Sequence, residues 1–130
     1  MGANDLLLAG RDARVEANAP AVLTLDLARA ARAPSGILEL ALTPERVAKN
    51  EPFLVSVMAE AEGRAPREIG SLAFFPPPRP GDTRQFLIDI SELPDTGRAK
   101  LVIRLVPAGR EPLTQTRLRV NGINFPERAH

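Results

Sequence analysis

The chain has 130 residues, of which 44% are hydrophobic and 25% are charged, and its net charge is +1. These values are typical of one globular domain and argue against a disordered segment. No apolar run approaches the roughly 18 residues that a membrane helix needs. Basic and acidic residues are interspersed, and Trp and Tyr are absent, so we expect neither membrane insertion nor nucleic-acid binding. The lack of cysteine excludes disulfides and thiolate metal sites, and without a recognisable signal peptide it favours a cytoplasmic protein.

Thirteen prolines are spread along the chain and disfavour long helices. Between them lie short runs of alternating apolar and polar residues, the pattern of half-buried strands. This pattern predicts an all-β fold, an antiparallel two-sheet β-sandwich of about eight short strands with Greek-key or jelly-roll connections. We expect one domain over residues 1–130, with 1–35 as a connecting segment and first strands, and 36–126 as the core of the sandwich. The expected strands are 6–9, 21–28, 37–43, 53–61, 69–75, 85–90, 99–106, 114–120 and 123–125.

Two local signals refine this scheme. Asn121-Gly122 is a strong two-residue turn signal and predicts a hairpin that folds Arg119-Val120 back onto Ile123-Asn124. The segment from Ser91 to Leu93 predicts one short helical turn, capped by Ser91 and ended by the proline that follows.

Residues able to perform chemistry are few. The only histidine, His130, is the last residue and is expected to be exposed, so we assign no catalytic, metal or cofactor-binding residue. The carboxylates occur in two pairs, Glu60 with Glu62 and Asp89 with Glu92. We expect the first pair to be a solvated rim at a strand end and Asp89 to bind the backbone NH groups of the following turn. A hydrolase built on Asp89 or Glu60 would need a close carboxylate pair in a cleft.

The proline-rich loop after the fifth strand is not explained by core building. Strand alternation allows only one of the two preceding phenylalanines to face the core. The prolines stiffen the loop, which suits docking into a neighbour, although they would equally protect an edge strand from aggregation. The candidate docking residues are Phe74, Phe75, Pro76, Pro77, Pro78 and Arg79.

A series of short motifs follows the expected strands in order. They are Pro52-Phe53-Leu54-Val55, Gly70-Ser71-Leu72, the Pro76 to Pro80 loop, Ile90-Ser91-Glu92-Leu93, Leu105-Val106-Pro107 and Asn121-Gly122-Ile123-Asn124-Phe125. In order and spacing they resemble the C-terminal domain that follows the di-copper domain of tyrosinases and polyphenol oxidases, the type-3 copper enzymes. The Lys-Phe-Asp-Val motif of the plant family corresponds to the first of them, which keeps the Phe and the Val.

The resemblance implies a β-sandwich that lies over the entrance to a di-copper site and controls latency through a side chain that fills the substrate pocket. Phe74 and Phe75 are the candidates for that plug. The implied partner is a copper-containing catalytic domain, in cis or in trans, so this chain by itself would bind no copper and would not be an enzyme. The alternative is a stand-alone β-sandwich interaction or assembly module, which could form a homo-oligomer. Arg-rich and Ala-rich usage favours a bacterial source.

Overall fold

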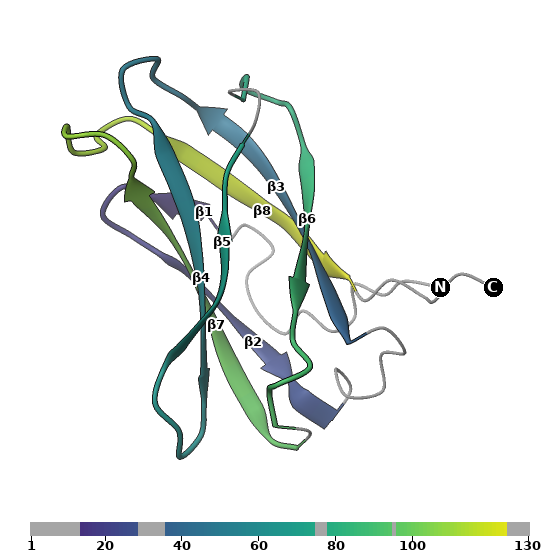
Figure 1. Cartoon of the computed structure of the whole chain (residues 1–130). Coiled ribbons are helices and arrows are strands. Elements are labelled where there is room, and N and C mark those ends of the chain that lie inside the picture. Colours follow the sequence, from purple (N-terminus) through teal and green to yellow (C-terminus); the bar gives the residue numbers. More distant parts are fainter. Residues whose placement is uncertain (1–13, 29–35, 75–77, 95, 125–130) are drawn as a thin grey trace.

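The computed structural model describes residues 14–28, 36–74, 78–94 and 96–124. Within them the chain forms two four-stranded antiparallel sheets, which confirms the predicted two-sheet sandwich (Figure 1). The strand expected at residues 6–9 lies outside the described residues. The strands are β1 (Arg14–Glu16), β2 (Ala21–Asp26), β3 (Ile37–Arg46), β4 (Phe53–Ala61), β5 (Arg67–Leu72), β6 (Arg84–Asp89), β7 (Arg98–Pro107) and β8 (Arg117–Asn124).

The strand order identifies the sandwich as a jelly roll. One sheet has the order β1-β8-β3-β6 and the other β2-β7-β4-β5. The pairs β1–β8, β2–β7, β3–β6 and β4–β5 are all antiparallel. This is the pairing of one long hairpin of eight strands that has been folded over into two layers. β1 and β2, although they lie within residues 1–35, are integral members of the two sheets.

The core between the sheets consists of the inward positions that alternation predicts. On β2, β3, β4 and β7 the apolar residues at every second position are buried between the sheets. These buried residues are Leu23 and Leu25 on β2, Leu38, Leu40 and Leu42 on β3, Val55 and Val57 on β4, and Leu101, Ile103 and Leu105 on β7.

The hairpin predicted at Asn121-Gly122 is wrong. β8 runs straight through both residues and pairs with β3, with Ala41 opposite Gly122 and Leu42 opposite Val120. Asn121 is therefore the extra residue of a β-bulge. The long partner strand β3 supplies backbone partners on both sides of the bulge, so the chain continues where an isolated Asn-Gly pair would reverse.

At the helical turn predicted for Ser91 to Leu93 the chain forms a single hydrogen-bonded turn, and Asp89, not Ser91, accepts the hydrogen bonds at its start. The Leu93 amide donates to the Ile90 carbonyl at 3.1 Å. The Asp89 carboxylate accepts hydrogen bonds from the Ser91 amide at 2.9 Å and the Ser91 hydroxyl at 2.6 Å. Asp89 thus binds the following turn as expected, and Ser91 donates to it instead of capping a helix.

The connections β1–β2, β3–β4, β5–β6 and β7–β8 all lie at the same end of the sandwich, because each follows a strand that runs in that direction (Figure 1). We call this the loop end. It carries the proline-rich segment.

Candidate functional site

Phe74, one of the two plug candidates, lies in the core. Its side chain is 8% exposed. Its ring packs against Phe53 at a centroid distance of 5.7 Å and against Phe86 at 5.1 Å, nearly edge-on in the second case. Phe74 is therefore the phenylalanine that faces inward, as the alternation argument requires of one of the two. Phe75, Pro76 and Pro77 lie outside the described residues.

Arg84, the first residue of β6, covers the outer side of Phe74. The carbon at the centre of its guanidinium group lies 5.6 Å from the centroid of the Phe74 ring, within cation–π distance. The Asp82 carboxylate accepts from Arg84 at 3.0 Å and 3.3 Å. An aromatic ring and a carboxylate therefore hold this cation in one orientation.

The described part of the β5–β6 loop is hydrogen-bonded to β3. The Gly81 amide donates to the Pro44 carbonyl of β3 at 2.8 Å, and the Asp82 amide donates to the Arg79 carbonyl at 3.0 Å. Gly81 has a φ of +87°, a conformation that L side chains rarely adopt, so glycine suits this turn. Together with the fixed φ of Pro78 and Pro80, these bonds restrain the backbone of residues 78–82.

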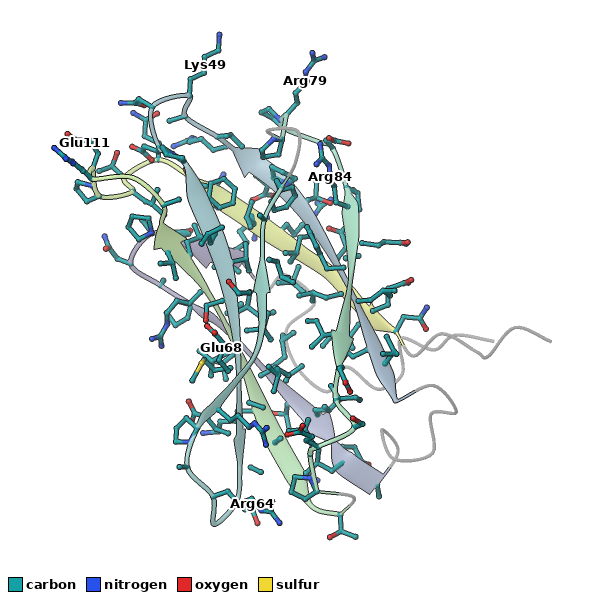
Figure 2. All side chains as sticks on the ribbon, in the orientation of Figure 1. Lys49, Arg64, Glu68, Arg79, Arg84 and Glu111 are labelled. Carbon is teal, nitrogen blue, oxygen red and sulfur yellow. The ribbon has the colours of Figure 1, made fainter. Side chains whose placement is uncertain are left out.

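An open hollow of about 830 Å³ lies beside this loop. Lys49 of the β3–β4 turn lines it on one side, and Arg79 of the β5–β6 loop and Arg84 of β6 line it on the other. Figure 2 shows Lys49 and Arg79 projecting from the same end of the sandwich, with Arg84 below them. We call this hollow the cationic groove. It is lined by Lys49, Pro78, Arg79, Pro80, Gly81, Asp82 and Arg84.

A buried carboxylate fixes a neighbouring loop at the same end. Glu51 is 5% exposed and belongs to the β3–β4 connection. It accepts hydrogen bonds from the amides of Thr114 and Gln115 at 3.0 Å and 3.1 Å, and from the hydroxyls of Thr114 and Thr116 at 2.5 Å and 3.3 Å. These donors, the Thr114 hydroxyl first, lower the pKa of Glu51 from 4.5 to about 2. The segment expected to start a strand at residue 114 instead binds Glu51, and β8 begins at Arg117.

Each carboxylate considered for acid–base chemistry either has a hydrogen-bond or ion-pair partner or is open to solvent. The hydrogen bonds from Ser91 lower the pKa of Asp89, so this group is a charged acceptor at neutral pH. Glu92 forms an exposed ion pair with Arg67. Glu60 and Glu62 line an open hollow at the opposite end of the sandwich from the cationic groove. The geometry therefore lacks the raised pKa of a general acid that a hydrolase based on Asp89 would require.

An apolar patch on the outer face of the β2-β7-β4-β5 sheet was not identified from the sequence. Val22 pairs with Val102, and Val102 pairs with Met58, so the three side chains stand in a row across three strands. Leu54 and Val106 form a second row. Val22 is 48% exposed and Val106 is 36% exposed. These residues occupy alternation positions that are polar in most surface strands, which is the signal that could have revealed them.

No family model, curated protein or solved structure matches the chain. Within the described ranges, no group of three or more His, Cys, Asp and Glu side chains is arranged to hold a metal ion. The part of the chain that the structure describes also contains no helix long and apolar enough to span a membrane.

Proposed function

We propose that this chain is a non-catalytic shielding domain that docks onto the catalytic domain of a tyrosinase-type copper oxidase. The order of the short motifs supports a copper oxidase as the partner. The described residues of these motifs lie at β4, β5, the β5–β6 and β6–β7 connections, β7 and β8. The observation that carries the docking role is that the proline-containing loop is held at both sides, by Phe74 inside the core and by the Gly81–Pro44 hydrogen bond.

Of the six candidate docking residues, three lie within the described residues, and we assign them different roles in the proposal. Phe74 anchors the loop, because its ring is enclosed by two other phenylalanines. Pro78 is half-buried and Arg79 is exposed, so Arg79 is available to a partner while Pro78 supports it. Phe75 remains the plug candidate, with Pro76 and Pro77 beside it. Copper would be held by the partner domain and not by this chain.

The test is inhibition in trans. The purified chain is mixed with the separately expressed di-copper domain of a tyrosinase, and oxidation of a diphenol is followed. We expect saturable inhibition that weakens when Phe75 or Arg79 is replaced by alanine. Arg64→Ala, at the opposite end of the sandwich, is the matched control and should inhibit like the parent chain. If the chain neither inhibits the copper domain nor co-sediments with it, the proposal fails.

A second candidate function, an assembly module, is favoured by the outer apolar patch of Val22, Leu54, Met58, Val102 and Val106. Val22 and Val106 are exposed, Leu54 and Met58 are half-buried, and Val102 is buried. Contiguous apolar surface marks interaction sites when enough of it is exposed, and here Val22 and Val106 supply the exposed part. Sedimentation velocity tests it: a concentration-dependent oligomer that Val22→Arg disperses would support assembly, whereas a monomer at all concentrations would exclude it.

A further inference from the structure

We propose that the cationic groove binds an extended acidic segment of a partner protein, with one apolar side chain of that segment seated against its prolines. The inference deepens the proposed docking role of the loop end and rests on it. The surface of the partner that the groove contacts would be acidic.

The charge of the groove is the first argument. Three cations, Lys49, Arg79 and Arg84, line it together with one carboxylate, Asp82, which is already bound by Arg84. Within the described residues, no carboxylate lies within ion-pair distance of Lys49 or Arg79. The whole chain has a net charge of only +1, so this excess is local. Complementary charge favours an anionic ligand and speeds its association.

The lining and position of the groove argue for a chain segment. Pro78 and Pro80 supply apolar surface between the cations. The hollow is open to solvent and runs between two connections of the sandwich, so an extended chain segment can lie along it. The chain has neither Trp nor Tyr, the usual platforms for stacking nucleic-acid bases. Carboxylates of a protein segment therefore fit this surface better than phosphates of a nucleic acid.

Both walls of the groove are held in place before a ligand arrives. The Arg79 wall is fixed by the Gly81–Pro44 and Asp82–Arg79 backbone hydrogen bonds. The Lys49 wall is a turn closed by the Glu51 amide, which donates to the Ala48 carbonyl at 3.1 Å. The carboxylate of Glu51 in turn binds Thr114. Because the backbone of both walls is already fixed, binding has to order only the side chains of Lys49 and Arg79.

The experiment is a titration of the ¹⁵N-labelled chain with the blocked peptide Glu-Glu-Phe-Glu-Glu, followed by amide chemical shifts. We expect the shifts to concentrate at Lys49 and residues 78–84 and to shrink as salt is added. Lys49→Glu combined with Arg79→Glu should weaken binding at least tenfold, because two favourable charge contacts become repulsive. The matched control is Arg64→Glu combined with Lys100→Glu, exposed cations at the other end of the sandwich, and should change binding less than twofold. All of these side chains are exposed, and thermal melts verify that each variant is folded.

Several results would overturn the inference. These are the absence of shifts at millimolar peptide, equal weakening by both double variants, or equal binding of the control peptide Lys-Lys-Phe-Lys-Lys. Shifts of the same size with inorganic phosphate would indicate a simple ion site, and binding to anionic lipid vesicles without binding to the peptide would indicate a membrane surface. Peptide binding at the groove without inhibition of the copper domain would leave this inference standing while the shielding role fails.

Discussion

Replacing Phe74 with alanine separates an anchoring role for this residue from a plugging role. Burial of a Phe side chain contributes about 2 kcal/mol, and each aromatic pair adds about 0.5–1.5 kcal/mol. Phe74 makes two such pairs and retains 8% exposure. We therefore expect Phe74→Ala to lower the free energy of unfolding by about 3 kcal/mol, within the usual range for core Phe→Ala changes. For a domain of this size, the expected fall in Tm is roughly 10 °C.

Urea unfolding followed by far-UV circular dichroism is the suitable assay, because the chain has no Trp or Tyr for fluorescence. Phe74→Leu, which keeps most of the volume and loses the ring contacts, should cost about 1 kcal/mol. Leu87→Ala on the neighbouring strand is the control, since Leu87 is 65% exposed and its loss should change stability by about 0.5 kcal/mol or less. A loss below 1 kcal/mol for Phe74→Ala would refute the anchoring role and restore Phe74 as a residue available to a partner.

Three further predictions concern the loops and surfaces. The pKa of Glu51 is about 2 in the folded chain and 4.5 ordinarily, so its stabilising effect should be fully present above about pH 4.5 and lost as the pH falls toward 2. Glu51→Gln should therefore lower Tm at pH 7 and flatten the Tm–pH curve in this window, and Glu111→Gln, at an exposed residue of the loop end, is the control for the loss of one carboxylate. Val22→Arg should leave Tm nearly unchanged, measured by thermal melts, because the side chain is 48% exposed. Arg67→Ala should cost less than about 1 kcal/mol in urea unfolding, because both members of its ion pair with Glu92 are exposed; a larger loss would show that the pair organises the β6–β7 turn.

The strands could be predicted because alternation is a strong constraint. Leu38, Leu40 and Leu42 can only share one face, and the prolines between the runs exclude long helices. The error at Asn121-Gly122 has a specific cause. The same two residues suit a tight turn and a bulge, and the choice depends on whether a partner strand continues past them. The partner strand is β3, which lies nearly eighty residues earlier in the chain: Thr43 of β3 is hydrogen-bonded to Asn121.

The candidate site was only partly accessible from the sequence. The strand period predicted that one of the two phenylalanines faces inward, and Phe74 does so, whereas the docking role of the proline-rich loop stays a prediction. Lys49 could not be assigned to the same surface, because its approach to Arg79 depends on how the β3–β4 and β5–β6 connections meet at the loop end. The role of Glu51 was hidden for a similar reason, since its donors at Thr114 to Thr116 lie more than sixty residues away.

The nested pairing of the strands also determines when the chain can fold. Among the strands that the structure describes, β8 is the single partner of β1, and Val15 lies opposite Leu118, so these first and last strands must find each other across about a hundred residues. β8 also separates β1 from β3, and β7 separates β2 from β4, so neither sheet can be completed until the two last strands have been synthesised. Such long-range pairing is slow, and the exposed edges of the unfinished sheets are vulnerable to aggregation. A chain shortened before Arg117 would therefore lose the pairing of β1 together with β8, and only the β3–β6 pair of that sheet would be left.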